Sequence, residues 1–202
     1  MKKRCVLIRH AKTKGNDEKR YIGANTDEEL SKSGIEQAER RKDDILKLVT
    51  KNTQVFSSPM KRALHTARLL FGDMSITVIK DLKETDFGLF EGKTYDDLKD
   101  DCDYQLFLDS KGRPGFPKGE KTEDFIKRSV EGFFEAIRVS TDNDLAIVCH
   151  GGNIMAVMSS LTKRDFYDFH TDNLDGYILE IETDGKRVLD LTFDRIGDRI
   201  SS

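Results

Sequence analysis

Short apolar runs alternate with longer helical patterns along this chain, and this alternation limits the fold more than any other feature of the sequence. Apolar, mostly β-branched runs predict four strands, at 4–8, 54–58, 76–80 and 145–149. Between and after these runs, apolar residues recur three and four positions apart, which predicts amphipathic helices. This order is typical of a sheet with helices on its faces. We therefore expect the α/β class and a three-layer α/β/α sandwich.

The last part of the chain carries a hairpin signal. Residues 177–182 and 188–193 flank an Asp184-Gly185 pair, which favours a tight turn between two antiparallel strands. The earlier strands are separated by helical segments, as parallel strands are. The sequence therefore predicts a mixed, mostly parallel central sheet.

Four helices are predicted from their apolar stripes. The stripes run from Ile35 to Val49, from Met60 to Leu70, from Ile126 to Ile137 and from Ile154 to Leu161. Ser33 with Glu36 fits a capping box, and Ser58 with Pro59 fits an N-cap followed by proline at the first helical position. Both pairs predict where a helix begins.

The length of 202 residues suits a single domain, 1–202. The formal net charge is −3, so we expect no nucleic-acid partner. No apolar run approaches the roughly 20 residues that span a bilayer, and the first apolar stretch is too short for a signal peptide. We expect a cytoplasmic protein with no membrane partner. Cys5, Cys102 and Cys149 lack a paired spacing and are expected to be reduced thiols.

Four chemically distinctive residues fall where predicted strands end. His10 follows the first strand by two residues, and His150 directly follows the fourth. Arg62 lies in the first turn of the helix after the second strand, and Glu84 lies just past the third. Ligands of open α/β sheets bind beyond the carboxyl ends of the strands, so these side chains are expected to meet at one edge. An arginine in a helical first turn is unfavourable unless an anion binds there.

A phosphoryl group is the anion that this set of side chains suits best. Arg9 and Arg62 would supply planar guanidinium forks for its oxygens. Neutral His10 is a competent nucleophile near pH 7, and His150, if protonated, would add a further donor. Glu84 could protonate the leaving alkoxide and later activate water, which requires a raised pKa and implies burial.

Small and polar residues follow His10. Ala11 and Gly15 leave room for close backbone approach, and Thr13 and Asn16 can donate hydrogen bonds to phosphate oxygens. An ordinary polar loop is the alternative interpretation of this stretch.

These residues resemble the histidine phosphatase superfamily, which has the phosphoglycerate mutase-like fold. Six blocks appear in the family's order over nearly the whole chain: LIRHAKTKGN, YIGANTDEELSKSGIEQA, VFSSPMKRALHTA, LKETDFGLFEG, FPKGEKTEDFIKR and VCHGGNI. The resemblance implies that His10 is the phosphorylated nucleophile and Glu84 the proton donor. It implies that the phosphate pocket and its neighbouring contacts are formed by Arg9, Arg62, His150, Thr13, Asn16, Gly23 and Gly151. It also implies that neither a metal nor another cofactor is needed.

Within the family, YIGANTDEELS, ETDFGLFEG and the short length are most similar to the small bacterial phosphatases typified by α-ribazole phosphatase of cobalamin synthesis. The expected function is hydrolysis of a small phosphorylated metabolite, such as α-ribazole 5′-phosphate. Two departures stand out. Ala11 replaces the usual glycine after the nucleophile, which predicts a slightly tighter pocket, and Lys12 stands where an acidic residue is common, which makes the entrance more basic.

Three alternatives remain open at this point. The first is a phosphoglycerate mutase, which would return the phosphoryl group to a second hydroxyl. The second is a non-catalytic protein that binds a phosphorylated ligand on the same fold. The third is a metal hydrolase that uses His10, His65, His150 and His170, although no close histidine pair occurs.

Substrate choice is expected to depend on residues 86–120, a cap or lid segment over the cleft. Its aromatic residues can stack on a base-like ring or form the core of the cap; they are Phe87, Phe90, Tyr104, Phe107 and Phe116. The sequence leaves open whether the protein is a monomer or a homodimer.

Overall fold

A six-stranded sheet forms the centre of the computed structural model, which describes residues 1–200. Its strands are β1 (Lys2–Arg9), β2 (Gln54–Ser57), β3 (Ile76–Val78), β4 (Asp144–Cys149), β5 (Gly176–Thr183) and β6 (Val188–Arg195). They lie in the order β3-β2-β4-β1-β5-β6. The first three neighbouring pairs are parallel, and β5 and β6 join as an antiparallel hairpin. The prediction of a mixed, mostly parallel sheet is confirmed.

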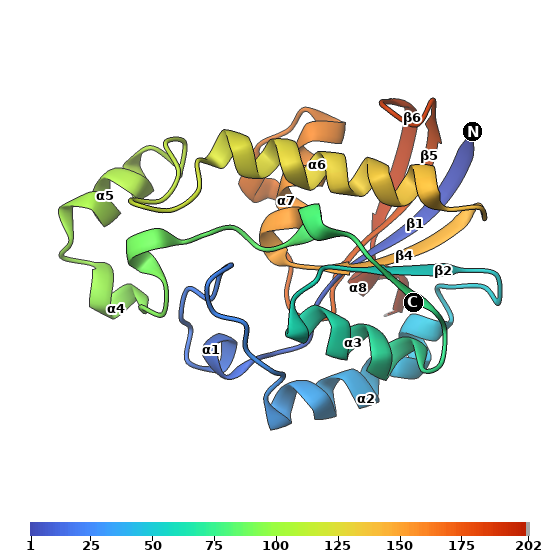
Figure 1. The fold of residues 1–202 in the computed structure, drawn as a ribbon, viewed down its shortest axis with the longest axis horizontal. Coiled ribbons are helices and arrows are strands. Elements are labelled where there is room, and N and C mark those ends of the chain that lie inside the picture. Colours follow the sequence, from blue (N-terminus) through green and yellow to red (C-terminus); the bar gives the residue numbers. More distant parts are fainter. Residues whose placement is uncertain (201–202) are drawn as a thin grey trace.

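Helices cover both faces of this sheet (Figure 1). One face carries α2 (Lys32–Leu46), α3 (Lys61–Phe71) and α8 (Ile196–Ile200), and the other carries α6 (Thr122–Val139) and α7 (Gly151–Thr162). β1 shows why both faces need a cover, because Cys5 and Leu7 join one core cluster while Val6 and Ile8 join the other. The predicted three-layer sandwich is confirmed.

Two predicted helix starts are wrong. Ser31, not Ser33, caps α2, because its hydroxyl accepts the N–H of Gly34, while Ser33 lies inside the helix and donates to Asp17. α3 begins at Lys61, two residues after Pro59. The hydroxyl of Ser58 accepts the N–H of Met60, just before the helix, at 3.3 Å. The same hydroxyl lies 2.7 Å from a ring nitrogen of His150.

The third strand is shorter than predicted. β3 ends at Val78, and the chain then turns so that Ile79 enters the core and η1, a 3-10 helix (Lys80–Leu82), follows. Ile79 is 1 % exposed. This turn carries the chain across the end of the sheet toward α6, which places the next residues near the ends of the other strands.

Residues 86–120 leave the sheet and return to it, and we call them the cap. They contain η2 (Gly88–Phe90), α4 (Tyr95–Leu98) and α5 (Cys102–Asp109), and they lie beyond the end of the sheet in Figure 1. The cap has its own core of Phe90, Leu98, Tyr104 and Phe107. Its two ends are joined by a hydrogen bond from the Glu120 N–H to the Asp86 carbonyl, 3.0 Å long. We call this junction the neck.

Two short elements complete the description: α1 (Lys14–Asp17), which follows β1, and η3 (Phe166–Phe169), which follows α7. Among residues 1–200, no helix is both long and apolar enough to cross a lipid bilayer.

Candidate active site

Three parallel strands end side by side and place three polar residues at one edge. His10, Ser58 and His150 directly follow β1, β2 and β4. The N–H groups of His10 and Ser58 donate to the carbonyls of Cys149 and Val148, at 3.0 and 2.9 Å, which extends the parallel ladder by one step. The rings of His10 and His150 lie 5.0 Å apart between centroids, at an angle of 65°. The topology thus brings together two histidines that are 140 residues apart in the sequence.

His10 is held as a neutral ring with a defined tautomer. Its Nδ1 lies 2.7 Å from the carbonyl of Ala11, and since a carbonyl can only accept, Nδ1 carries the proton. Nε2 therefore keeps its lone pair. Burial, followed by the charges of Arg62 and Arg9, lowers the pKa of His10 well below its ordinary value. A buried imidazole with a free lone pair is suited to nucleophilic attack.

Arg62 is the most deeply buried cation of the site, with 1 % of its surface exposed. Its Nε donates to Nδ1 of His150 at 3.2 Å, and its two terminal nitrogens donate to the carbonyls of Thr26, Ile22 and Gly23 at 3.0 to 3.3 Å. Among residues 1–200, the hydrogen-bond partners of this guanidinium are all neutral and no carboxylate contacts it directly. A buried positive charge in such surroundings favours binding of an anion.

His150 is engaged at both ring nitrogens. Nδ1 accepts from Arg62, so Nε2 carries the proton, and it lies 2.7 Å from the hydroxyl of Ser58. Burial, and then the positive charge of Arg62, lowers the pKa of His150 well below its ordinary value. The sequence analysis considered a protonated His150. In this arrangement the ring is neutral, and it acts as a donor through Nε2 alone.

Arg9 supplies a second guanidinium. One terminal nitrogen donates to the carbonyl of Thr171, while Nε is buried and has no hydrogen-bond partner within residues 1–200. Gly151, the first residue of α7, lies against this group, because a Cβ built there would approach Nε of Arg9 to 3.4 Å. A buried N–H without an acceptor is costly, so this site favours an acceptor such as a phosphate oxygen.

Glu84 brings a carboxyl group to the same edge. It is 7 % exposed, and burial raises its pKa above the ordinary value for a glutamate. Its oxygens accept the N–H groups of Thr85 at 2.9 Å and Gly152 at 3.4 Å. The raised pKa is the direction that sequence reasoning required for a proton donor.

The loop after His10 is stabilised by hydrogen bonds to other protein groups. Thr13 and Asn16 form a reciprocal capping box at the start of α1, and Asn16 also accepts from Asn173 at 3.3 Å. The N–H of Ala11 donates to the hydroxyl of Thr66 at 2.9 Å, and its methyl group packs in the core. The unusual alanine therefore fills space beneath the site.

Gly23 lies behind the guanidinium of Arg62. Its carbonyl accepts from Arg62, and its N–H donates to Glu91 at 2.8 Å. A Cβ at this position would approach the carbonyl of Thr85 to 2.3 Å, so only glycine fits. Its backbone groups serve to hold Arg62 and Glu91 in place.

The other two histidines lie outside this hydrogen-bonded group. His65 lies 3.9 Å from the exposed carboxylate of Glu29. His170 is exposed, and burial, followed by the positive charge of Arg9, lowers its pKa. Within residues 1–200, no set of three or more His, Cys, Asp and Glu side chains is arranged to hold a metal ion.

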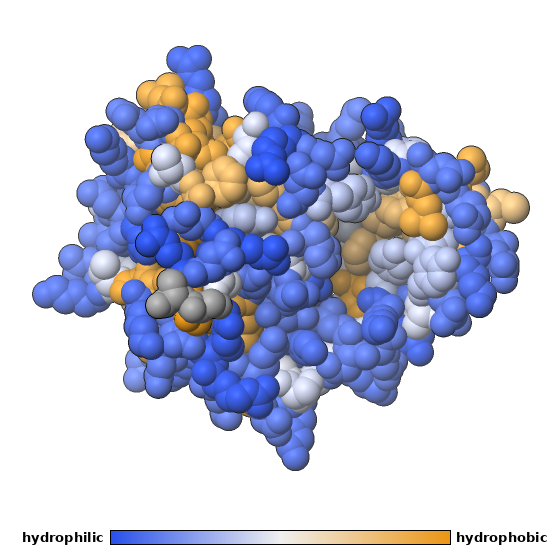
Figure 2. Space-filling model, turned by 180° about the vertical axis from the view of Figure 1, so that it is seen from behind, coloured by the Kyte–Doolittle hydropathy of each residue, from blue (hydrophilic) through white to orange (hydrophobic). Residues whose placement is uncertain are grey.

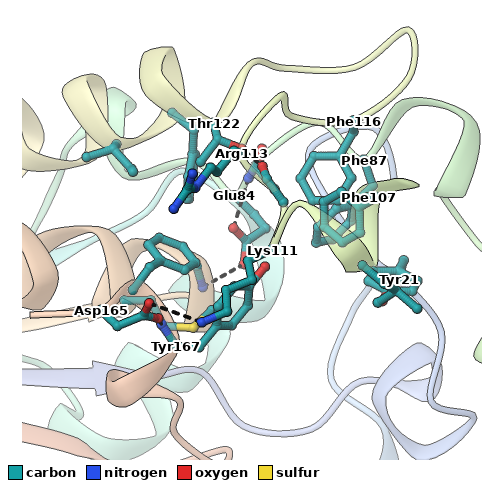
Figure 3. Close-up of a pocket in the computed structure, with 18 residues that line it drawn as sticks. Tyr21, Glu84, Phe87, Phe107, Lys111, Arg113, Phe116, Thr122, Asp165 and Tyr167 are labelled. Atoms are coloured by element: carbon teal, nitrogen blue, oxygen red, sulfur yellow. Dashed lines mark hydrogen bonds and ion pairs between the residues drawn. The ribbon is translucent and has the colours of Figure 1, made fainter. Parts of the chain in front are cut away.

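A deep pocket of about 560 Å³ opens between the cap and the body and reaches Glu84 (Figure 3). Seven of its lining residues are aromatic: Tyr21, Phe87, Phe107, Phe116, Phe125, Phe166 and Tyr167. Lys111 and Arg113 from the cap bring positive charge, and Lys111 lies 3.8 Å from Asp165 of the body.

Seen from behind, the surface is hollowed between cap and body, and hydrophobic residues lie within the hollow (Figure 2). Phe90 and Tyr104 instead fill the core of the cap.

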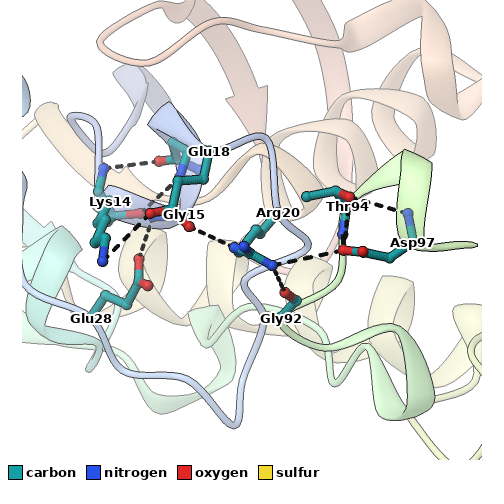
Figure 4. Close-up of polar contacts among 10 residues, drawn as sticks. Lys14, Gly15, Glu18, Arg20, Glu28, Gly92, Thr94 and Asp97 are labelled. Carbon is teal, nitrogen blue, oxygen red and sulfur yellow. Dashed lines mark hydrogen bonds and ion pairs between the residues drawn. The ribbon is translucent and has the colours of Figure 1, made fainter.

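Arg20 fastens the loop after α1 to the cap (Figure 4). It donates to the carboxylate of Glu18 at 2.6 Å and to the carbonyl of Gly92 at 2.7 Å, and lies 3.8 Å from Asp97. Nearby, Tyr21 and Tyr104 share a hydrogen bond of 2.9 Å between their hydroxyls. Tyr21, which lines the pocket, is thus linked to the cap by a hydrogen bond.

Sequence reasoning missed several residues of the site. Gly152 must lack a side chain, because a Cβ would approach Oε1 of Glu84 to 2.5 Å. Ser58 contacts His150, and Asn173 donates to the carbonyl of His10 at 2.8 Å. The glycine pair after His150 was the available signal for Gly152. No local pattern marks Asn173, which arrives from the loop before β5.

The chain is similar in sequence and in fold to known proteins. The family model described as the histidine phosphatase superfamily (branch 1) matches residues 5–194. A Hydrogenobacter thermophilus protein named "Putative phosphoserine phosphatase 2" is 32 % identical over 194 residues, covering 92 % of each chain. The crystal structure of a Shigella flexneri α-ribazole phosphatase is 27 % identical, with a TM-score of 0.74 and coverage of 92 % and 93 %. An Entamoeba histolytica phosphoserine phosphatase, solved with 3-phosphoglyceric acid, is 26 % identical, with a TM-score of 0.75 and coverage of 94 % and 96 %.

Proposed function

We propose that this chain, which belongs to branch 1 of the histidine phosphatase superfamily, hydrolyses phosphate monoesters through a phosphohistidine at His10. The observation that carries the proposal is that a neutral His10, whose Nε2 keeps a lone pair, and a buried Glu84 of raised pKa both lie near the guanidiniums of Arg9 and Arg62. Two guanidiniums beside a nucleophile and a proton donor are the charge arrangement that a phosphoryl group requires.

In the first step, Nε2 of His10 attacks phosphorus as the bond to the leaving oxygen breaks. Protonated Glu84 gives its proton to that oxygen, and the alcohol departs. Arg9 and Arg62 stabilise the phosphoryl oxygens, with the Nε of Arg9 gaining the acceptor that it lacks. The carbonyl of Ala11 stabilises the positive charge that develops on the ring of His10.

In the second step, water attacks phosphorus and the bond to Nε2 breaks. Glu84, now a carboxylate, takes a proton from the water, which restores both groups and releases inorganic phosphate. A general acid and base of this kind contributes about 10²- to 10⁴-fold. None of these steps needs a metal ion, and the proposed enzyme is metal-independent.

We propose a substrate with a bulky, planar leaving group, such as α-ribazole 5′-phosphate. The pocket beside Glu84 has seven aromatic lining residues and a volume of about 560 Å³, which suits a ring system. Serine or glycerate would leave much of this volume unfilled. The name of the Hydrogenobacter thermophilus relative nevertheless makes phosphoserine the second candidate substrate.

The test is a phosphatase screen in the presence of a chelator. The substrates are p-nitrophenyl phosphate, α-ribazole 5′-phosphate, phosphoserine, sugar phosphates and 3-phosphoglycerate, each with wild type, His10→Ala and, as a matched control, His65→Ala. We expect wild type and the control to release inorganic phosphate, and His10→Ala to lose over ~10³-fold. Interconversion of phosphoglycerates without phosphate release would indicate a mutase instead. Phosphate binding without turnover would indicate a non-catalytic protein.

A further inference from the structure

The segment that carries Glu84 has no strand or helix of its own to fix it. η1 ends at Leu82, and the next helix does not begin until the cap. The backbone carbonyls of Asp81, Lys83 and Glu84 all accept hydrogen bonds from one side chain, that of Arg128 on α6. The position of the Glu84 backbone therefore depends on a residue 44 positions further along the chain.

Arg128 uses all five of its N–H groups. Nε and one terminal nitrogen donate to the two carboxylate oxygens of Glu120, at 2.6 and 2.7 Å, and the remaining three donate to the carbonyls just named. Both members of the ion pair are largely buried, with exposed fractions of 24 % for Arg128 and 19 % for Glu120. A bidentate pair of this kind is rigid, and a lysine cannot reproduce it.

The ion pair lies at the neck of the cap. The N–H of Glu120 donates to the carbonyl of Asp86, and Glu84 lies two residues before Asp86. Arg128 therefore contacts both sides of the neck, the outgoing side through the Glu84 segment and the returning side through Glu120. It fixes the proton donor relative to the cap that forms one wall of the pocket.

The same guanidinium also stacks on a wall of the pocket. Its central carbon lies 4.9 Å from the ring centroid of Phe125. A Cβ built on Gly152 would meet both Glu84 and Phe125, at 2.5 and 2.9 Å, so these two side chains converge on the same point. Phe125 therefore lies close both to Arg128 and to the carboxyl group of Glu84.

We propose that Arg128 is a positioning residue, which together with Glu120 holds the carboxyl group of Glu84 at the leaving oxygen of the substrate. The proposal rests on the proposed function, in which Glu84 is the proton donor. Other contacts remain when Arg128 is changed: Asn153 donates to the carbonyl of Lys83 at 3.3 Å, and the N–H of Ala24 donates to the carbonyl of Thr85 at 2.8 Å. Misplacement by about 1 Å can cost as much as 10²-fold in rate.

The test compares two leaving groups. A p-nitrophenolate ion departs readily without a proton, whereas an alkoxide needs one, so only alkyl phosphates depend strongly on Glu84. For Arg128→Lys we expect kcat/KM to fall about 10- to 30-fold on an alkyl phosphate such as a ribose 5-phosphate, and less than about threefold on p-nitrophenyl phosphate. Glu120→Gln keeps the shape of the side chain and weakens the ion pair, so it should give the same pattern at about three- to tenfold.

A double-mutant cycle separates positioning from general damage. In a Glu84→Gln background there is no proton to place, so adding Arg128→Lys should cost less than about twofold on the alkyl phosphate. Arg138→Lys is the matched control, since Arg138 on the same helix also pairs with a carboxylate, that of Glu131, but at the far end of α6. It should leave both substrates within about twofold of wild type.

Three outcomes would overturn the proposal: equal losses on the two leaving groups, an undiminished loss in the Glu84→Gln background, or no loss in either Arg128→Lys or Glu120→Gln. A wild type that hydrolyses neither substrate would instead contradict the proposed function and, with it, this inference. An active wild type whose Arg128 variants lack leaving-group selectivity would contradict the inference alone.

Discussion

The proposed phosphate site, formed around His10, Arg62 and His150, and the aromatic pocket are built in opposite ways. His10, Ser58 and His150 lie at the ends of paired strands, and each side chain makes a hydrogen bond to another protein group. The residues that line the pocket come from the cap, from loops of the body and from the ends of helices. Tyr167 is 45 % exposed, whereas Arg62 is 1 % exposed.

This difference separates two tasks. Phosphoryl transfer requires fixed charges and a fixed proton donor, which buried strand ends provide at the cost of desolvating them. Recognition of the leaving group requires surface area and shape, which loops can change without disturbing the sheet. We therefore expect substitutions at the first region to reduce turnover of every substrate and those at the second to change the order of substrate preference.

The largest effect that sharpens this comparison is expected for Glu84→Gln. The kcat/KM for alkyl phosphates should fall about 10²- to 10⁴-fold, because the leaving alkoxide receives no proton. The decrease in kcat/KM should be far smaller for p-nitrophenyl phosphate. Equal decreases in kcat/KM for both substrates would contradict a proton-donor role.

The pH dependence of the wild type follows from the same groups. Activity on alkyl phosphates should fall as the pH rises through the raised pKa of Glu84. It should also fall at low pH as His10 becomes protonated, at a pH below its ordinary pKa.

The pH dependence of stability should follow the direction of the Glu84 pKa shift. Because the pKa of Glu84 is higher in the folded than in the unfolded protein, this carboxyl group stabilises the fold at pH values below its unfolded pKa. The contribution is lost as the pH rises through its folded pKa. Glu84→Gln should therefore raise the melting temperature at pH 7 and change it little at pH 4.

Arg62→Lys should lower kcat/KM for every substrate by about 10²- to 10³-fold, since one preorganised donor group is lost from the phosphate site. It should also destabilise the fold, because four hydrogen bonds of a buried guanidinium cannot be reproduced by an ammonium group. Arg68→Lys, on the exposed face of the same helix, is the matched control for both kinetics and thermal melting.

A substitution in the pocket should change selectivity instead. Phe116 packs against Phe87 and Phe107, with ring centroids 4.8 and 4.7 Å away. Phe116→Ala should lower kcat/KM about tenfold for a monoester with an aromatic leaving group and less than about twofold for phosphoserine. Leu106→Ala, an exposed position of the cap, serves as the control. A uniform loss across substrates would show that the two regions are not separable.

The smallest effect is expected for Arg20→Ala. This side chain is 39 % exposed, so its ion pairs stabilise the fold only weakly and are screened by salt. Activity should stay within about twofold of wild type, and any difference in melting temperature should shrink at high ionic strength. Lys14→Ala, in the same network but 82 % exposed, provides the reference.

The sequence allowed the meeting of His10 and His150 to be predicted, because strand periodicity is a local signal and parallel pairing gives it a long-range consequence. A strand such as 145–149 is recognised from its own residues, and parallel pairing then places His150 next to His10. The helix starts were predicted less well, since a serine two positions away offers the same chemistry. Ser31 rather than Ser33 caps α2, and only the tertiary contact of Ser33 with Asp17 distinguishes them.

The aromatic pocket could be predicted only in part. Its cap residues Phe87, Phe107 and Phe116 lie in the segment that was expected to select the substrate. Phe125 and Tyr167 come from elsewhere in the chain, and nothing in their local sequence distinguishes them from core residues. Pocket membership is set by how the cap packs on the body, which is a tertiary property that no short pattern encodes.

Rapid-quench analysis of Glu84→Gln with p-nitrophenyl phosphate tests the account most directly. This leaving group departs without a proton, so phosphate should transfer to the enzyme, and without a general base the hydrolysis of the adduct should be slow. We predict a burst of p-nitrophenolate and an acid-labile phosphoryl group that maps to His10. Turnover without any covalent adduct, or an adduct on a different residue, would contradict the account.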